Sequence, residues 1–257
     1  MTTGELPAEV RDAVVRVAQT ARLLVAMDFD GTMSPLVSRA GDARPLPAAA
    51  AAFAALTALE GTTTALVSGR ALASLRAVAS PPARTLLVGS HGAEVWLGPG
   101  SPALSLSPTQ AQALELARAA VQSAVDNYPG TVAEQKPAGV VLHYRLASER
   151  DGQAAVQEVR EGLTGRPGLF LSEGKMVLEI SVVKADKGES LAMLRSTTGA
   201  TAVVFVGDDV TDEHGFAALQ PGDLGIKVGP GDTAAAVRIG SPEQVPPVLE
   251  LILSTRA

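Results

Sequence analysis

The chain has 257 residues, of which 46% are hydrophobic, and it carries a formal net charge of −6. It contains no cysteine, which excludes disulfides, a thiolate nucleophile and cysteine-ligated metals. Acidic and basic residues are interspersed rather than blocked, so the composition argues against nucleic acid or a membrane surface as partner and favours a small-molecule substrate.

The N-terminal segment, residues 1–19, is charged and lacks an apolar stretch of signal-peptide length. No later run approaches the roughly 20 apolar residues that a membrane-spanning helix needs. We therefore expect a cytoplasmic protein, and we expect it to be a monomer.

Four continuous apolar runs end at a polar residue or a glycine. They predict strands buried on both faces of a parallel sheet, at residues 23–27, 65–67, 86–88 and 202–206. Segments with a helical period occupy residues 47–59, 72–78, 187–195 and 212–219. This alternation predicts an α/β fold with a Rossmann-like parallel sheet, whose chemistry lies just past the carboxyl ends of the strands.

Residues 104–183 follow a different pattern. Two helical segments are each followed by two short strand-like segments, in the order 108–125, 131–136, 139–146, then 149–163, 169–172, 175–180. We interpret this stretch as a smaller α+β cap domain, inserted into a catalytic core that residues 1–103 and 184–257 form. Residues 98–102 and 182–187 are the expected linkers.

The sequence Asp28-Phe29-Asp30-Gly31-Thr32 directly follows the first predicted strand. Two carboxylates one residue apart at a strand end can point into one site, and Gly31 permits a sharp turn. One carboxylate can attack phosphorus while the other transfers protons, so we assign Asp28 as nucleophile and Asp30 as acid and base. The alternative, a calcium-binding loop, would need further oxygen ligands and a glutamate at set spacing.

Two other positions carry residues suited to a phosphate group. Ser68-Gly69-Arg70 follows the second strand, where a hydroxyl and backbone N–H groups can hold a phosphate oxygen. Lys187 opens a helix and could neutralise both the attacking carboxylate and the phosphoryl group. Each has an ordinary alternative, because serine commonly caps helices and lysine commonly lies on the surface.

The densest acidic cluster lies at residues 207–213, after a strongly apolar strand. Gathering Asp208, Asp209 and Asp212 is costly without a cation, and Mg²⁺ prefers such oxygen ligands. We therefore expect Mg²⁺ as the cofactor, with Asp209, Thr211 and Asp212 supporting the site. Helix capping by Thr211 or Asp212 is the alternative for part of this cluster.

In this order along the chain, these motifs resemble the haloacid dehalogenase superfamily of aspartate-nucleophile phosphatases. Within it, the chain is similar to the trehalose-6-phosphate phosphatases over nearly its whole length. One departure is Ser181-Val182, where a basic residue and a proline commonly follow Glu-Ile. The segments that carry the resemblance are DFDGTMSP, SGR, GSHGAE, HYR, GKMVLEI and GDDVTDEHGF, at residues 28–35, 68–70, 89–94, 143–145, 174–180 and 207–216.

The resemblance implies a haloacid dehalogenase core with an inserted cap that grips the sugar. It implies Mg²⁺ held by Asp28, the main-chain carbonyl of Asp30 and Asp208, with Ser68 and Lys187 as further catalytic groups. The residues expected to bind substrate are Gly69, Arg70, His91, Gly92, Glu134, Lys136, Arg145 and Glu179. Independently, Glu134 and Lys136 lie two apart and share one strand face, although a same-face ion pair on a solvated surface would also explain them.

Together these expectations describe a phosphoric monoester hydrolase of trehalose biosynthesis. It would convert trehalose 6-phosphate to trehalose and phosphate through an aspartyl-phosphate intermediate. One alternative is a phosphatase of another sugar phosphate, such as sucrose phosphate or a phosphohexose. Another is a catalytically silent regulatory subunit that binds a sugar phosphate. A separate trehalose-6-phosphate synthase is the expected protein partner.

Overall fold

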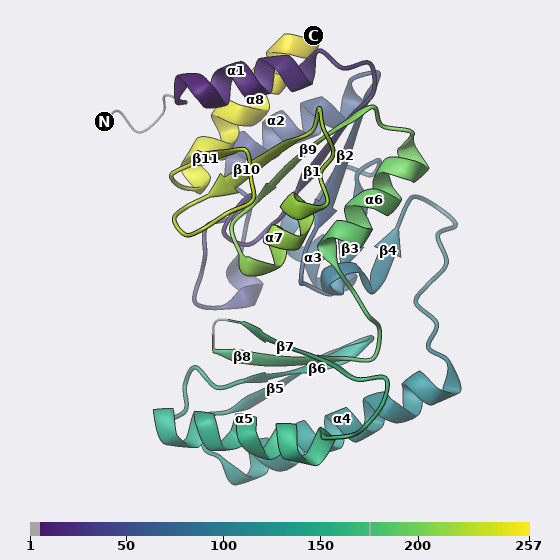
Figure 1. Cartoon of the computed structure of the whole chain (residues 1–257), viewed down its shortest axis with the longest axis vertical. Helices are drawn as coiled ribbons and strands as arrows, with labels where there is room; N and C mark the ends of the chain where they lie inside the picture. The colour runs from purple at the N-terminus through teal and green to yellow at the C-terminus, as the bar shows by residue number, and fades with distance from the viewer. Residues whose placement is uncertain (1–5, 175) are drawn as a thin grey trace. The chain divides into compact units, whose positions relative to one another are not determined.

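The computed structural model describes residues 6–174 and 176–257, which belong to two compact units (Figure 1). The first unit consists of Met1–Pro102 and Asp186–Ala257, and the second of Ala103–Ala185. The chain therefore leaves the first unit once and returns to it, as it does around an insertion. Within the described residues, no helix combines the length and apolar character needed to cross a bilayer.

The first unit is built on a seven-stranded sheet in the order β11-β10-β9-β1-β2-β3-β4. Neighbouring strands are parallel except for β3 and β4. Because β1 lies between β2 and β9, the chain reverses its direction of winding there, at the point where ligands bind in such sheets. The strands are β1 (Leu23–Met27), β2 (Thr62–Val67), β3 (Leu86–Gly89), β4 (Glu94–Trp96), β9 (Ala202–Gly207), β10 (Leu224–Val228) and β11 (Val237–Ile239).

Both faces of this sheet are covered, because consecutive side chains of a strand point to opposite sides. In β1, Leu23 and Val25 belong to one hydrophobic cluster, whereas Leu24 and Ala26 belong to another. Four helices contribute to the first cluster: α1 (Ala8–Ala18), α2 (Pro47–Ala58), α3 (Leu72–Ala79) and α8 (Val245–Arg256). Two contribute to the second: α6 (Lys187–Thr198) and α7 (Val210–Ala217). This layering confirms the predicted α/β class.

The start of α7 differs from the expected one. Its N-cap residue is Asp209, and Oδ2 of Asp212 accepts hydrogen bonds from the backbone N–H groups of Asp208 and Asp209, at 2.9 and 2.8 Å. Neither Thr211 nor Asp212 is therefore the N-cap, because the chain already turns into the helix at Asp209. Both residues lie in the first helical turn.

The second unit is a four-stranded antiparallel sheet in the order β5-β6-β8-β7. Its helices α4 (Pro108–Asn127) and α5 (Glu149–Leu163) form one hydrophobic cluster with side chains of β6 and β8. The strands are β5 (Val132–Lys136), β6 (Gly139–His143), β7 (Phe170–Gly174) and β8 (Val177–Ser181). Strand β6 ends earlier than expected, because Tyr144 and Ala147 close a turn through a backbone hydrogen bond of 3.2 Å.

Residues on the other face of this sheet are aligned across three strands. Glu134 pairs in register with Val141, which pairs with Glu179, so these side chains share a face, and Lys136 shares it two residues along β5. The cluster with α4 and α5 is formed by the alternate residues, including Leu142.

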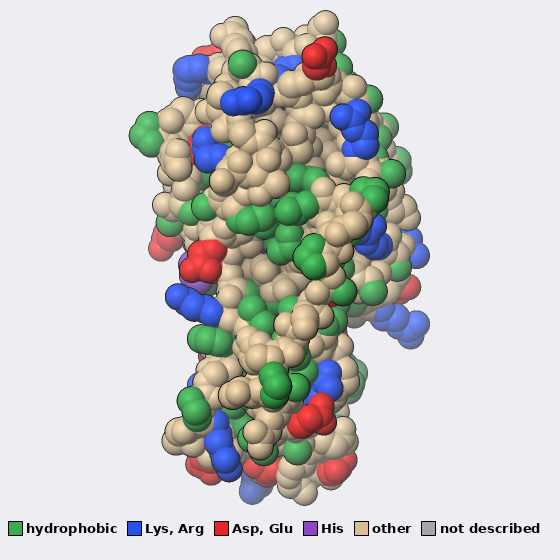
Figure 2. Space-filling model, turned by 90° about the vertical axis from the view of Figure 1, so that its right-hand side faces the viewer, with side chains coloured by type: hydrophobic (Ala, Val, Ile, Leu, Met, Phe, Trp, Pro, Cys, Tyr) green, Lys and Arg blue, Asp and Glu red, His purple; other side chains and the backbone are tan. Residues whose placement is uncertain are grey.

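On the molecular face shown in Figure 2, lysine and arginine side chains lie scattered instead of gathering in one patch.

Candidate active site

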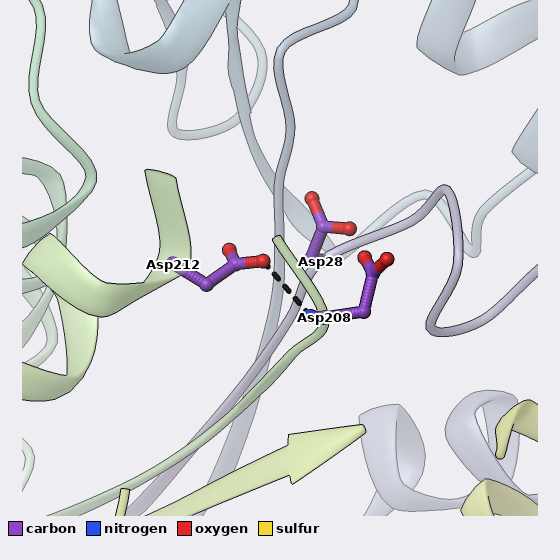
Figure 3. A group of neighbouring side chains, drawn as sticks. All are labelled: Asp28, Asp208 and Asp212. Atoms are coloured by element: carbon purple, nitrogen blue, oxygen red, sulfur yellow. Dashed lines mark hydrogen bonds between the residues drawn. The ribbon is translucent and has the colours of Figure 1, made fainter. Parts of the chain in front are cut away.

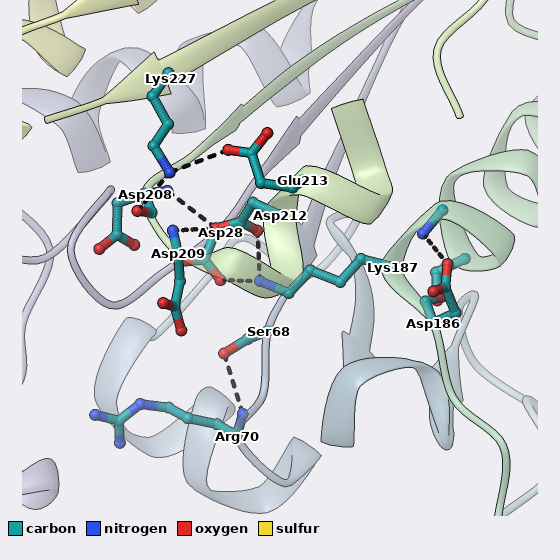
Figure 4. Close-up of polar contacts among 12 residues, drawn as sticks. Asp28, Ser68, Arg70, Asp186, Lys187, Asp208, Asp209, Asp212, Glu213 and Lys227 are labelled. Atoms are coloured by element: carbon teal, nitrogen blue, oxygen red, sulfur yellow. Dashed lines mark hydrogen bonds and ion pairs between the residues drawn. The ribbon is translucent and has the colours of Figure 1, made fainter. Parts of the chain in front are cut away.

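The carboxyl ends of β1, β2 and β9 lie side by side in the first unit. The residues that directly follow these strands are Asp28, Ser68 and Asp208 (Figure 4). The backbone N–H of Asp28 donates to the carbonyl of Val206 at 2.9 Å, which continues the pairing of β1 with β9 by one residue. Strand pairing therefore fixes the backbone position of Asp28, the predicted nucleophile.

Lys187, the first residue of α6, reaches this edge of the sheet. Its Nζ donates to Oδ1 of Asp28 at 2.8 Å and to Oδ1 of Asp212 at 2.6 Å. The lysine is 2% exposed. The start of its helix is held by Asp186, whose carboxylate accepts from the backbone N–H of Gly188 at 2.7 Å. A fixed helix end thus carries a buried cation between two buried carboxylates.

Asp212 organises the cluster from the first turn of α7. One of its oxygens accepts from Lys187, and the other accepts from the backbone N–H groups of Asp208 and Asp209. A Cβ at Gly207 would lie 2.3 Å from Cγ of Asp212, so only glycine fits at the end of β9. Asp212 therefore contacts Lys187 and the backbone of Asp208 and Asp209 at the same time, and its supporting role stays a prediction.

Three carboxylates lie close together at this edge. Asp28, Asp208 and Asp212 each offer a carboxylate oxygen, and these atoms lie within 4.8 Å of one another (Figure 3). Lys187 forms ion pairs with two of them, Asp28 and Asp212. Like charges in a buried place attract protons or cations.

The pKa values of Asp28 and Lys187 are shifted by burial and by the neighbouring charges. Burial raises the pKa of Asp28 well above its ordinary value, and the carboxylates of Asp212 and Asp208 add to the rise while Lys187 opposes it. Burial would lower the pKa of Lys187, but the charges of Asp28 and Asp212 outweigh burial and raise it. Both pKa values are raised, so both groups hold their protons more tightly than they would in water.

The cluster suits a divalent cation. Its three carboxylates offer neighbouring oxygen donors, and such a donor set fits Mg²⁺. Because both oxygens of Asp212 accept from neighbours, Asp28 and Asp208 are better suited as ligands. Gly31 has a φ of 82°, and a Cβ there would lie 2.2 Å from Oδ2 of Asp208, so glycine keeps the space beside that carboxylate open.

Asp30, the expected acid and base, forms an ion pair with Arg70, an expected substrate ligand. Nε of Arg70 donates to Oδ2 of Asp30 at 2.6 Å, and its second amino group donates to Oδ1 at 2.7 Å. The guanidinium also lies 5.6 Å from the ring centroid of Phe29. Both carboxylate oxygens of Asp30 therefore accept from one guanidinium.

The Ser68-Gly69-Arg70 segment begins a loop between β2 and α3. Ser68 is 1% exposed, and its Oγ accepts from the backbone N–H of Arg70 at 3.2 Å. His91 and Gly92 belong to η2 (Ser90–Gly92), and the imidazole of His91 lies so close to Gly69 that a Cβ there would be 2.5 Å from Cε1. These expected ligands therefore lie in one packed group.

Lys227 and Glu213 also belong to this cluster of contacts. Neither residue was assigned a catalytic or supporting role from the sequence. Lys227, 4% exposed in β10, donates to the backbone carbonyl of Asp208 at 2.8 Å and pairs with Glu213 at 3.2 Å. Glu213 also accepts from the backbone N–H of Ala234 at 2.8 Å. The available signal was a lysine inside an apolar run, Leu224–Val228, which is rare in a buried strand unless the charge is paired.

Three of the expected sugar-binding residues of the second unit take part in two pairs, one of which includes His143, a residue to which no binding role was assigned. Lys136, 7% exposed, donates to Oε1 of Glu179 at 2.8 Å. Glu134 and His143 are hydrogen bonded at 2.8 Å, which lowers the pKa of Glu134. Arg145 lies in the exposed turn after β6. The structure thus brings four polar side chains onto one sheet face, and Lys136 is paired there with Glu179.

A mostly parallel α/β sheet with an inserted α+β unit, and with aspartates at the carboxyl ends of its central strands, has the architecture of the haloacid dehalogenase fold. The particular family follows from comparison with known proteins. A family model described as Trehalose-phosphatase matches residues 26–241, and the chain belongs to this family.

Known relatives agree with that assignment. A Trehalose-phosphate phosphatase of Mycobacterium marinum is 33% identical over 236 residues, covering 87% of this chain and 60% of the relative. A Bifunctional trehalose-6-phosphate synthase/phosphatase of Thermoproteus tenax is 32% identical over 227 residues, covering 87% of this chain and 31% of the relative. The chain thus spans about three fifths and under one third of these proteins.

A solved structure extends the likeness to the fold. The C-terminal domain of the C. albicans trehalose-6-phosphate phosphatase superposes with a TM-score of 0.81 at 21% identity. The match covers 98% of this chain and 99% of that one. At this identity the similarity establishes the fold, including the inserted unit, and carries no residue roles.

Proposed function

We propose that this protein hydrolyses trehalose 6-phosphate to trehalose and phosphate, with Mg²⁺ as cofactor and Asp28 as covalent nucleophile. The observation that carries the proposal is the contact of Lys187 with Asp28, inside the cluster formed by the carboxylates of Asp28, Asp208 and Asp212. The family supports phosphoester chemistry, and the names of the relatives support the substrate.

In the first half of the reaction, a carboxylate oxygen of Asp28 forms a bond to phosphorus while the bond from phosphorus to the sugar oxygen breaks. Asp30 gives its proton to the leaving sugar oxygen. In the second half, Asp30 takes a proton from water as that water attacks phosphorus, which releases phosphate and restores the Asp28 carboxylate. Opening of the Asp30–Arg70 pair precedes the proton transfer and leaves Arg70 able to bind a phosphate oxygen.

Ser68 and Lys187 would hold the phosphoryl oxygens that gain charge during transfer. Ser68 is buried at the end of β2, and the ammonium of Lys187 is fixed by two hydrogen bonds. Groups held in place before the reaction stabilise developing charge without reorganising. Lys187 also keeps Asp28 oriented, and Asp212 keeps Lys187 in place.

The side chains of Asp28 and Asp208 and the carbonyl of Asp30 would hold Mg²⁺. When bound, this ion would offset negative charge of the carboxylates and polarise the phosphate. The protein's own contribution is the set of contacts that fixes these ligands. Gly31 leaves room beside Asp208, and Lys227 holds the Asp208 backbone.

The second unit would supply the groups that recognise the sugar. A disaccharide presents many hydroxyls, and a site built to bond them discriminates against ligands that leave its buried polar groups unpaired. Lys136 and Glu179 are largely buried and polar, and Glu134 shares their sheet face. A trehalose-6-phosphate synthase would supply the substrate, since the relative from Thermoproteus tenax carries both names in one chain.

The direct test is release of phosphate from trehalose 6-phosphate, with and without Mg²⁺, beside a panel that includes sucrose phosphate and phosphohexoses. We expect metal-dependent hydrolysis that prefers trehalose 6-phosphate and disappears in Asp28→Asn. Activity on another panel member alone would keep the reaction and contradict the substrate. Binding of sugar phosphates without hydrolysis would contradict the enzyme.

A further inference from the structure

The loop after β3 holds two consecutive non-glycine residues in the left-handed region. Ser90 has a φ of 48° and His91 a φ of 57°. L-amino acids adopt this conformation at a cost, and such strain persists where the surrounding structure imposes it. Contacts with neighbouring residues must therefore hold Ser90 and His91 in this conformation.

On one side, the turn grips the Ser68-Gly69-Arg70 segment. The backbone N–H of Ser90 donates to the carbonyl of Arg70 at 2.7 Å, and that of His91 donates to the carbonyl of Ser68 at 3.0 Å. Between these two bonds, the His91 ring packs against Gly69, where a Cβ would lie 2.5 Å from Cε1 and 2.6 Å from Nε2. The left-handed backbone thus aims two successive N–H groups at the carbonyls on either side of Gly69.

Behind the turn, a buried carboxylate fixes it to α3. Glu94 is 9% exposed, and its Oε2 accepts from Oγ of Ser90 at 2.7 Å and from the backbone N–H of Leu72 at 3.3 Å. Leu72 is the first residue of α3, and its N-cap, Ala71, has no side-chain acceptor of its own. Glu94 therefore replaces the missing cap and ties the turn to the helix that follows the Ser68 loop.

On the other side, the turn touches the helix that carries Lys187. Gly92 has a φ of 130°, and a Cβ there would lie 2.7 Å from Oγ of Ser190 and 3.3 Å from the backbone of Asp186. Ser190 belongs to α6, and Asp186 is its N-cap. One short turn is thus wedged between the loop that bears Ser68 and the helix that begins with Lys187.

We propose that Ser90 and His91 are positioning residues, which set the distance between Ser68 and Lys187 and so shape the place of the phosphoryl group. This inference rests on the proposed phosphatase function and deepens it. It gives His91 a role through Gly69 and Ser68 at the phosphate end of the substrate, in place of contact with the sugar. The hydrolysis of every phosphate ester, whatever its alcohol, should then depend on this turn.

The test compares variants of His91 in the full chain with Mg²⁺ present. His91→Val places a β-branched residue at positive φ, whereas His91→Asn keeps a residue that tolerates it. We expect His91→Val to raise the inhibition constant of inorganic phosphate about tenfold, and to lower kcat/KM by a similar factor for trehalose 6-phosphate and for p-nitrophenyl phosphate. His91→Asn should recover most of this loss.

Ser80→Val is the matched control, because Ser80 also has a positive φ, of 44°, but lies at the C-terminal end of α3. It carries the same backbone penalty away from the Ser68 loop. We expect it to lower thermal stability as His91→Val does and to leave the inhibition constant of phosphate unchanged.

A double-mutant cycle keeps the test valid if His91→Val does not fold. Gly69→Ala alone should weaken phosphate binding, because the added methyl meets the His91 ring. In the background of His91→Gly, the same Gly69→Ala substitution should cost little, since the atoms that it would strike are gone. Additive effects of the two substitutions would contradict the positioning role.

Two further outcomes separate the inference from the proposed function. If His91→Val weakens only trehalose 6-phosphate and leaves inorganic phosphate and p-nitrophenyl phosphate unaffected, His91 contacts the sugar and the inference is wrong. If the wild-type protein hydrolyses neither ester, the proposed function itself is contradicted, and the inference that rests on it is overturned too.

Discussion

Asp28 is the proposed nucleophile and a ligand of the proposed Mg²⁺, and its carboxylate can also bind a proton, so metal binding at this site would depend on pH. The pKa of Asp28 is raised, chiefly by burial and then by the carboxylates of Asp212 and Asp208. A folded-state pKa above the unfolded one stabilises the fold at low pH, and this stabilisation is lost as pH rises through the folded pKa. A bound cation replaces the proton and removes that loss.

We therefore predict that Mg²⁺ raises the melting temperature more at mildly basic than at mildly acidic pH. The Mg²⁺ concentration for half-maximal stabilisation should fall as pH rises, because fewer protons compete. Thermal unfolding at a series of pH values and Mg²⁺ concentrations measures both. In Asp28→Asn, which has no carboxyl to titrate there, the pH dependence should largely vanish. Stabilisation by Mg²⁺ that is equal at all pH values would contradict the link.

Lys227 yields a second prediction for a single side chain. Loss of its ammonium in Lys227→Met frees the Asp208 carbonyl and leaves Glu213 without its ion pair. Removing a group that orients a metal ligand typically costs 10–100-fold in affinity, so we expect Mg²⁺ binding about tenfold weaker by thermal titration. Arg84→Ala removes one positive charge from an exposed position before β3 and should change nothing. If Lys227→Met and Arg84→Ala weakened Mg²⁺ binding equally, Lys227 would act only through the net charge of the protein and not by orienting Asp208.

The sequence was sufficient to predict which residues meet at the carboxyl edge of the sheet. Asp28, Ser68 and Asp208 follow strand ends, and parallel strands bring such ends to one edge. It could not reveal the Asp30–Arg70 pair, because that contact depends on which way two long or flexible side chains turn.

Among the helices, α8 was not recognised from its sequence and yet anchors the first unit. Arg256, in its last turn, donates to the carbonyl of Ala18 at 2.6 Å and to that of Gly61 at 2.8 Å, so one guanidinium joins α8 to the end of α1 and the start of β2. We expect Arg256→Ala to lower the free energy of unfolding by about 1.5–3 kcal/mol, as hydrogen bonds to a charged group would. Urea denaturation measures this, and turnover of the folded enzyme should not change.

Arg84→Ala serves as the matched control for that experiment, since it removes an exposed arginine of the same unit. Its unfolding free energy should stay within about 0.5 kcal/mol of the wild-type value. If Arg256→Ala were equally mild, the bonds from Arg256 would be exchangeable for water, and the anchoring role would fail.

Some of the elements that were not predicted break the ordinary sequence signals. Helix α8 opens with Pro246 and Pro247, which are tolerated in a first turn but disguise it. Strand β10 contains Gly225 and Lys227, which interrupt its apolar run. By contrast α5 was predicted with its observed bounds, Glu149–Leu163, because a serine cap and a clear apolar stripe mark it.

For the whole molecule, the proposed division of labour assigns phosphate chemistry to the first unit and sugar recognition to the second. Lys136→Met or Glu179→Gln should lower kcat/KM for trehalose 6-phosphate about 10- to 100-fold, the worth of a lost hydrogen bond to a charged group. Hydrolysis of p-nitrophenyl phosphate should stay within about twofold, since that ester has no sugar.

An ion pair elsewhere in the second unit provides the control for these variants. Arg160 pairs with Glu173, and Arg160→Met should affect neither substrate. If Lys136→Met slowed both esters equally, the second unit would serve the reaction itself, and the division of labour would be wrong.

The covalent role of Asp28 is the central claim, and trapping tests it most directly. The enzyme is mixed with trehalose 6-phosphate and Mg²⁺, quenched within a turnover, and treated with borohydride, which reduces an aspartyl-phosphate to homoserine. We predict homoserine at position 28 by peptide mass spectrometry, absent without substrate and in Asp28→Asn. Rapid turnover with Asp28 unmodified, or a reduced residue at another position, would contradict it.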